Sequence, residues 1–286
     1  MLSAIARYIP QPIKPPLRSL FFAVADLIDS LPGNRDRLSP PGYMRTYIGD
    51  GDFHERGQQF LRYHIDLANL GADECVLDVG CGIGRMAAGL TGYLNEKGHY
   101  DGFDIVKRGV VWCTRHIGRK HPNFRFNHSD VYNRAFNPTG KFTAAEYQFP
   151  YPPESFDYVF AYSVFTHMIT GDLKNYTEEI ARVLKPGGRC LITYFLLNDH
   201  SLDSIGRKTS ALEFKPYSKE SQAISLETPE FALAYDERFI TTQYAKNGLT
   251  IQRPIHYGSW SNRSDFLDFQ DIVVAIKGIE PYQQES

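Results

Sequence analysis

The residues that say most about chemistry are three glycines, at positions 80, 82 and 84, which follow a short, mainly apolar segment, Val76–Val79. Glycines at this spacing let the backbone turn tightly and approach a ligand without Cβ clashes. The segment after the turn has helical character, and the first N–H groups of a helix carry a partial positive charge. The stretch therefore predicts a buried strand, a glycine-rich turn and a helix arranged around a ligand.

A carboxylate at position 104 is the second feature of this predicted site. Asp104 follows a predicted strand, His99–Phe103, and stands about 20 residues beyond the turn, where an acidic residue can bind ribose hydroxyls. Arg85 occupies the place of the third glycine of a dinucleotide fingerprint, G-x-G-x-x-G. The two features predict a nucleoside site on a Rossmann-like sheet and leave a NAD-dependent oxidoreductase as the less favoured alternative.

Two motifs resemble those of a known family. Asp78-Val79-Gly80-Cys81-Gly82-Ile83-Gly84 resembles motif I of the class I S-adenosylmethionine-dependent methyltransferases, and Ile180–Gly188 is similar to the helix end and turn that lead into their fifth strand. The resemblance covers about residues 52–277. It implies a Rossmann-like α/β fold with a seven-stranded, mostly parallel sheet in the order 3-2-1-4-5-7-6. Helices would cover both faces, and the last strand would be antiparallel.

The same resemblance implies S-adenosyl-L-methionine as the cofactor. In the family the glycine turn faces the methionine end of the cofactor, and an acidic–apolar pair after the third strand contacts the adenine. Asp130 would accept from the exocyclic amine, while Val131 and Ile105 would pack on the two faces of the ring. The expected cofactor-binding residues are Asp78, Gly80, Gly82, Gly84, Asp104, Ile105, Asp130, Val131 and Tyr162.

The end of the predicted fourth strand, Phe156–Ser163, should approach the transferable methyl group. An Asn/Asp-Pro-Pro-aromatic motif, typical of methyltransferases that act on nucleobases or glutamine amides, is missing there. The aspartate that metal-dependent catechol-type enzymes place at this strand end is missing as well, so we predict no catalytic metal. The leading hypothesis is O-methylation of a small molecule or glycan, and the further alternative is a non-catalytic cofactor-binding scaffold.

An oxygen acceptor has to lose its proton, so a nearby base is expected. His167 is the first candidate, because it follows this strand end and an imidazole can titrate near neutrality. A structural histidine that caps the next turn is the alternative. His200, after the predicted fifth strand, and His256, in the loop between the last two strands, are second choices.

Two loops are candidate acceptor walls. Residues 132–155 form a long connection rich in aromatic side chains, which predicts either a lid or substrate wall, or packing onto the sheet edge. Trp260 and Arg263 lie in the last loop and would suit a sugar or an anionic acceptor, although surface packing explains them equally well.

Composition narrows the class of protein. The net charge of −2 gives no basic surface for nucleic acid. The four cysteines form no C-x-x-C pair, which favours buried thiols in a reducing compartment over disulfides or a zinc site. No apolar run approaches the roughly 20 residues of a membrane span, and no clear signal-peptide cleavage site is present. We therefore expect a cytoplasmic protein.

The predicted domain organisation is an N-terminal arm, residues 1–51, followed by a methyltransferase domain, residues 52–286. The arm carries an amphipathic helix over 17–31, which could dock on its own domain, in a homodimer or on a membrane surface. The first helix of the domain should be capped by Asp52, and His64 on its apolar stripe should be a core histidine. Residues 196–235 break the alternation of strands and helices and indicate an insertion.

Two further helices are expected around the predicted nucleoside site. The first covers Met86–Leu94, after the glycine turn. The second covers Lys107–Lys120, after the predicted second strand, with Val110, Val111, Thr114 and Ile117 facing inward.

Overall fold

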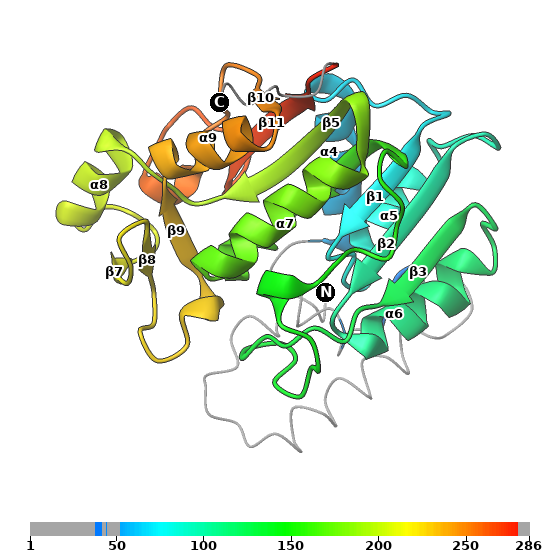
Figure 1. Cartoon of the computed structure of the whole chain (residues 1–286), viewed down its shortest axis with the longest axis horizontal. Coiled ribbons are helices and arrows are strands. Elements are labelled where there is room, and N and C mark those ends of the chain that lie inside the picture. Colours follow the sequence, from blue (N-terminus) through cyan, green and yellow to red (C-terminus); the bar gives the residue numbers. More distant parts are fainter. Residues whose placement is uncertain (1–37, 42–43, 45–51, 280–286) are drawn as a thin grey trace, which may run out of the picture.

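A seven-stranded sheet forms the centre of the computed structural model, which describes residues 38–41, 44 and 52–279 (Figure 1). The predicted arm helix lies outside the described residues. The strands run in the order β10-β11-β5-β4-β1-β2-β3. Their bounds are β1 Cys75–Val79, β2 His99–Asp104, β3 Phe124–His128, β4 Phe156–Ala161, β5 Leu184–Tyr194, β10 Leu249–Ile251 and β11 Asp271–Lys277.

The direction of the strands confirms the predicted fold class. The strands from β3 to β5 are parallel, and β11 pairs antiparallel with both β5 and β10. Numbered by place in the chain, this is the expected 3-2-1-4-5-7-6 order. The inner strands β1 and β4 are mainly apolar and largely buried, because both faces of a parallel sheet are covered by helices.

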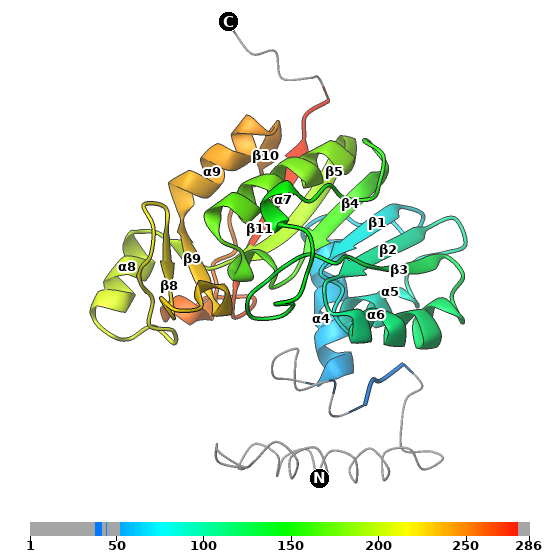
Figure 2. The same cartoon turned by 60° about the horizontal axis from the view of Figure 1, so that its bottom comes forward.

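Each face of the sheet has its own hydrophobic core. On one face lie α4 (Phe53–Asp66), α5 (Arg85–Leu90) and α6 (Lys107–Cys113), and on the other lie α7 (Thr170–Val183) and α9 (Glu237–Lys246) (Figure 2). Alternate strand residues divide between the two cores: Val76 packs with the first group of helices, and Leu77 with the second. This alternation follows from the two-residue period of a strand.

The helices after the glycine turn and after β2 differ from expectation. We predicted Met86–Leu94 for the first, but α5 ends at Leu90. The second was predicted as one helix over 107–120, and instead α6 passes at Cys113 into a π-helical turn, Thr114–Gly118. Its buried side chains are Val110, Trp112, Cys113 and Ile117. Val111 and Thr114, predicted to face inward, are exposed.

Helix α4 begins and packs as predicted. The side chain of Asp52 accepts hydrogen bonds from the backbone N–H groups of His54 and Glu55 and so caps the helix. His64 is buried, and its Nδ1 lies 2.7 Å from the hydroxyl of Tyr158 on β4. Burial lowers the pKa of His64 to about 3. The imidazole is therefore a neutral core group, as the apolar stripe indicated.

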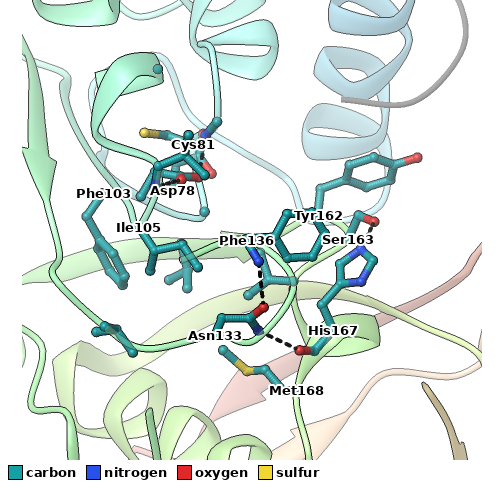
Figure 3. A pocket seen from close by; sticks show the side chains of 18 of the residues that line it. Asp78, Cys81, Phe103, Ile105, Asn133, Phe136, Tyr162, Ser163, His167 and Met168 are labelled. Atoms are coloured by element: carbon teal, nitrogen blue, oxygen red, sulfur yellow. Dashed lines mark hydrogen bonds between the residues drawn. The ribbon is translucent and has the colours of Figure 1, made fainter. Parts of the chain in front are cut away.

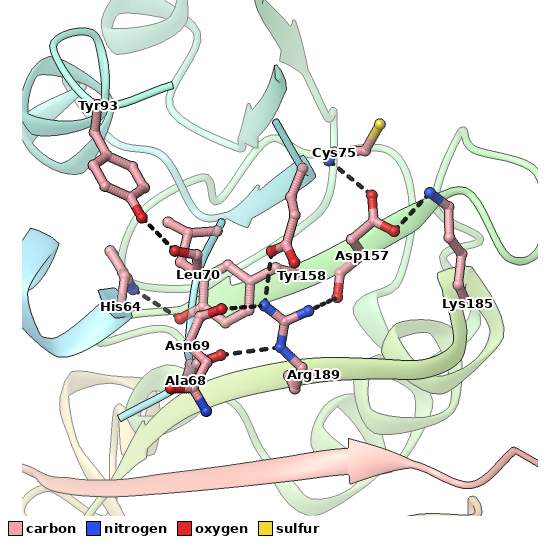
Figure 4. Close-up of polar contacts among 11 residues, drawn as sticks. His64, Ala68, Asn69, Leu70, Cys75, Tyr93, Asp157, Tyr158, Lys185 and Arg189 are labelled. Atoms are coloured by element: carbon pink, nitrogen blue, oxygen red, sulfur yellow. Dashed lines mark hydrogen bonds and ion pairs between the residues drawn. The ribbon is translucent and has the colours of Figure 1, made fainter. Parts of the chain in front are cut away.

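A polar network fastens the loop after α4 to the start of the sheet (Figure 4). Arg189 on β5 donates to the backbone carbonyls of Ala68 and Asn69 at 3.0 Å and to Glu74 at 2.7 Å. Next to it, Asp157 accepts from Lys185 at 2.7 Å. These bonds lie at the amino end of β4, so the opposite end of the sheet stays open for a site.

Residues 196–236 build a second, four-stranded sheet. Its strands are β6 (Leu196–Leu197), β7 (Lys215–Pro216), β8 (Ser221–Ala223) and β9 (Leu233–Asp236), in the order β6-β9-β8-β7, with α8 (Asp199–Gly206) beside them. This segment is the one in which the sequence breaks the regular alternation. In the described part of the chain no helix is long and apolar enough to span a bilayer.

One buried carboxylate joins the second sheet to the first. Asp271, at the start of β11, accepts from the backbone N–H of Leu196 and Gly258 at 2.6 Å and from the indole N–H of Trp260 at 2.9 Å. Trp260 is 0% exposed and packs on Phe195. The interpretation of Trp260 as an open acceptor face is therefore wrong, because the ring fills the core between the two sheets.

Candidate functional site

A cavity of about 910 Å³ opens at the carboxyl edge of the sheet. It is lined by the segments that follow β1, β2, β3 and β4, together with residues just before β11. Ligands of open α/β sheets bind at this edge, and ligand cavities have volumes of about 300–1,000 Å³. The described cavity is thus in the place and of the size expected for a small-molecule site.

The glycine turn forms one wall of the cavity. The φ angles of Gly80, Gly82 and Gly84 are +86°, +55° and +78°, a region that favours glycine. A Cβ at Gly80 would lie 2.3 Å from Cγ2 of Val164. Gly80 and Gly82 line the cavity. Gly84 instead faces α6, where a Cβ would lie 2.9 Å from Sγ of Cys113, so its missing side chain makes room for helix packing.

The two predicted carboxylates both line the cavity beside this turn, and Figure 3 shows Asp78 there. Asp104 accepts from the backbone N–H of Gly82 at 2.8 Å and from that of Val106 at 2.6 Å. Asp78 accepts from the hydroxyl of Tyr100 at 2.6 Å. Burial raises the pKa of Asp78 to about 8 and also raises that of Asp104, where the two backbone N–H groups oppose the shift. A cation beside Asp78 would favour its ionised form.

The residues expected around an adenine separate into two groups. Ile105 and Val131 line the cavity. Asp130 lies outside it, with its carboxylate 3.7 Å from Nζ of Lys141, and its backbone carbonyl accepts from the N–H groups of Lys141 and Phe142. The predicted contact of Asp130 with adenine stays a prediction.

The end of β4 brings Tyr162 to the cavity, where it meets Arg56 from α4. The hydroxyl of Tyr162 accepts from the guanidinium of Arg56 at 2.8 Å, and Arg56 also pairs with Asp268 at 3.1 Å. Tyr162 was predicted, whereas Arg56 was missed. The sequence places Arg56 on the first helix of the domain but does not show that this helix turn faces the end of β4.

His167 lies at the other end of the cavity, after a serine with unusual backbone geometry (Figure 3). Its Nδ1 is 2.9 Å from the carbonyl oxygen of Glu230, and its Nε2 is 3.4 Å from Oγ of Ser163. Burial lowers the pKa of His167. Ser163 has a φ of +56° and lines the cavity too, although the sequence did not single it out.

The second-choice histidines lie elsewhere. His200 lies on α8, with Nε2 3.1 Å from the carbonyl oxygen of Ser261. The backbone of His256 bridges to Ile272 on β11. Both side chains are outside the lining of the cavity. Arg263, proposed for the acceptor edge, is outside the lining as well and lies over the ring of Tyr257.

The long aromatic connection supplies a wall of the cavity. Tyr132, Asn133 and Phe136 line it. Asn133 holds this wall in place, because its amide nitrogen donates to the carbonyl of His167 at 3.1 Å while its oxygen accepts from two backbone N–H groups of the loop. Among the described residues, no group of three or more His, Cys, Asp or Glu side chains is arranged to hold a metal ion.

Comparison with known proteins agrees with this geometry. Residues 76–188 match the family model described as "Methyltransferase domain". The chain is 31% identical over 129 residues to the O-methyltransferase cnsE of Penicillium expansum, which covers 44% of this chain and 40% of that protein. It is 32% identical to 27-O-demethylrifamycin SV methyltransferase of Amycolatopsis mediterranei (strain S699), covering 45% and 41%. The chain thus spans about two fifths of the length of these relatives.

Similar solved structures share the fold. The PH0226 protein of Pyrococcus horikoshii OT3 aligns with a TM-score of 0.55 at 16% identity, over 84% of this chain and all of that one. The [4+2]-cyclase SpnF aligns with a TM-score of 0.51 at 16% identity, over 82% of this chain and 86% of that one. Because a cyclase is among the neighbours, the fold by itself does not define the reaction.

Proposed function

Because residues 76–188 belong to the class I S-adenosylmethionine-dependent methyltransferases, we propose that this chain methylates a hydroxyl group of a small molecule or glycan. The observation that supports this most directly is the bond between the N–H of Gly82 and the carboxylate of Asp104. It joins the glycine turn and the ribose-type carboxylate in one cavity, whose far end holds His167.

The residues at the turn fit a sulfonium nucleoside. Asp104 is held by two backbone N–H groups and keeps acceptor capacity for hydroxyl donors. Ile105 and Val131 offer apolar surface for a base, and Asp78 offers a carboxyl for an ammonium group. Bound there, S-adenosylmethionine would supply a methyl group activated by a positively charged sulfur.

The chemistry left to the protein is alignment and proton removal. A carbonyl oxygen only accepts, so the contact with Glu230 places the proton of neutral His167 on Nδ1. Nε2 is therefore a proton acceptor that faces Ser163 within the cavity. Since burial lowers its pKa, His167 is unprotonated at neutral pH and ready to take a hydroxyl proton at Nε2.

Calorimetry with S-adenosylhomocysteine and with NAD tests the cofactor assignment. We expect S-adenosylhomocysteine to bind the chain and NAD not to bind, and Gly82→Val to weaken the first interaction at least tenfold by placing a branched side chain in the turn. Gly206→Val is the matched control, because a Cβ there has no neighbour within 4 Å. Binding of NAD without S-adenosylhomocysteine would instead support an oxidoreductase.

The scaffold alternative predicts a different combination of results. A scaffold would bind S-adenosylhomocysteine and respond to Gly82→Val, but it would transfer no methyl group to any hydroxyl acceptor. The relatives named O-methyltransferase and 27-O-demethylrifamycin SV methyltransferase favour a catalyst with a hydroxyl acceptor.

A further inference from the structure

We propose that the His167 end of the cavity binds a neutral, largely apolar molecule through a single hydroxyl group, rather than a saccharide. We call this end the acceptor subsite and define it by Ser163, His167, Tyr132, Phe136 and Phe269, all of which line the cavity. The proposal rests on the proposed function, which it narrows to one class of acceptor.

The polar part of the subsite is a directed chain of hydrogen bonds. The amide nitrogen of Gln270 donates to Oγ of Ser163 at 3.0 Å, and that hydroxyl points its own hydrogen at Nε2 of His167. The last contact is long, at 3.4 Å, so a ligand hydroxyl that donates to Nε2 replaces a weak bond. Ser163 can then turn its hydrogen elsewhere, because a hydroxyl both donates and accepts.

The backbone supports a special role for this serine. Ser163 adopts a φ of +56° two residues after the end of β4, a conformation that is strained for a residue other than glycine. Its N–H donates to Oγ1 of Thr193 on β5 at 2.8 Å, which holds the strained residue in place. The unusual backbone conformation of Ser163 therefore holds its hydroxyl beside His167.

The side-chain amide nitrogens beside the subsite are engaged within the protein, whereas Oε1 of Gln270 is buried without a hydrogen-bond partner among the described residues and so offers one acceptor to a ligand hydroxyl. Asn133 uses its amide on the carbonyl of His167 and on its own loop, and Gln270 uses its nitrogen on Ser163. A saccharide presents many hydroxyls, and each that loses water without a new partner costs free energy. Asp172 also lines the cavity and would repel an anionic ligand when ionised.

The rim of the subsite is aromatic and open to solvent. Tyr132, Phe136 and Phe269 are 44%, 41% and 40% exposed although they also line the cavity. The ring of Phe136 lies edge-on to His167, with 4.9 Å between the ring centroids. Apolar surface that continues from a cavity wall to its mouth marks a ligand groove, and a molecule anchored at His167 would extend across these rings.

Titration calorimetry with the full chain, saturated with S-adenosylhomocysteine, tests the proposal. The probes are 2-naphthol, its methyl ether 2-methoxynaphthalene, and methyl α-D-glucopyranoside. We expect 2-naphthol to bind at least tenfold more tightly than either of the others. Phe136→Ala should weaken the binding of 2-naphthol at least tenfold. Tyr217→Ala, which removes an exposed aromatic side chain outside the cavity, should leave this binding unchanged.

His167→Phe separates hydroxyl recognition from general apolar binding. This variant should bind 2-naphthol and its methyl ether equally, with unchanged affinity for S-adenosylhomocysteine. Preference for the glucoside, failure of 2-naphthol to bind, or a naphthol preference that survives in His167→Phe would each overturn the proposal. If the wild-type chain does not bind S-adenosylhomocysteine, the proposed function itself is contradicted.

Discussion

A single backbone carbonyl determines the chemistry of His167. Its contact with the oxygen of Glu230 fixes which ring nitrogen carries the proton, and the surrounding protein lowers the pKa of the ring. Two other buried groups show the same dependence on surroundings: the pKa of His64 falls to about 3, whereas that of Asp78 rises to about 8. In all three, burial disfavours the charged form, so the direction of each shift follows from the sign of the charge.

The lowered pKa of His167 predicts the pH dependence of catalysis. The active form is the unprotonated ring, so kcat should remain constant as the pH falls through 6.5 and should decline only below it, where the ring gains a proton. His167→Gln should lower kcat by about 10²–10⁴-fold and remove this acidic limb. The measurement is a pH–rate profile of methyl transfer.

The control for this profile is His200→Gln, which alters a histidine outside the cavity and should keep the wild-type rate. An acidic limb at or above pH 6.5 that persists in His167→Gln would assign the titration to another group.

At the scale of secondary-structure elements, the second sheet and the central sheet are held together through Asp271. The three N–H donors of this carboxylate come from β6, from the loop before β11 and from the indole of Trp260. The short turn Pro229–Phe231, which precedes β9, supplies the carbonyl of Glu230 that orients His167. Correct docking of the second sheet is thus a condition for the geometry of the site.

Removing the Asp271 carboxylate should therefore destabilise the protein. Asp271→Ala leaves three buried donors without an acceptor, at about 1–3 kcal/mol each, so we expect a loss of about 3 kcal/mol or more in the free energy of unfolding. Urea denaturation gives this quantity. Asp265→Ala, at an exposed carboxylate in the same loop, should change it by less than about 0.5 kcal/mol.

The raised pKa of Asp271 also predicts how the free energy of unfolding changes with pH. Burial raises its pKa to about 7, above the value of about 3.9 in an unfolded chain. The folded state then holds the proton more tightly than the unfolded chain. Its contribution to the free energy of unfolding is therefore complete below about pH 4 and is lost as the pH rises through 7. A stability difference between wild type and Asp271→Ala that grows from pH 5 to pH 8 would contradict this.

At the scale of the whole molecule, the cavity is assembled from distant parts of the chain. The turn after β1, the carboxylate after β2, the loop after β3, the end of β4 and the residues before β11 meet at one edge. Parallel strands bring their carboxyl ends to the same edge, which explains why residues nearly 200 positions apart, such as Gly82 and Gln270, border one space.

A ligand that bridges these segments should stabilise the entire fold. S-adenosylhomocysteine at 100 times its dissociation constant should add about 2.7 kcal/mol to the free energy of unfolding, because it binds the folded chain only. Thermal denaturation should show a higher midpoint with the ligand and a smaller shift for Gly82→Val at the same concentration, because a tenfold weaker affinity reduces the added free energy to about 1.4 kcal/mol. An equal shift in that variant would place the binding site away from the turn.

The sequence by itself determined the fold class and the residues that form the glycine-turn end of the cavity. Gly80, Gly82, Asp78 and Asp104 are local signals: a turn that requires glycine, and carboxylates at the carboxyl ends of two strands. The order of the strands and the antiparallel β11 were expected correctly from the family motifs. Local patterns are sufficient there because each depends on the backbone of a few consecutive residues.

Only the tertiary structure decided which side chains meet at the other end of the cavity. Arg56 reaches Tyr162 from α4, Gln270 reaches Ser163 from the last loop, and Glu230 reaches His167 from the second sheet. Trp260 was expected at the surface and is buried, while Gly84 packs on a helix. These contacts join residues far apart in sequence, and their geometry depends on how helices and sheets pack, which no short stretch of residues encodes.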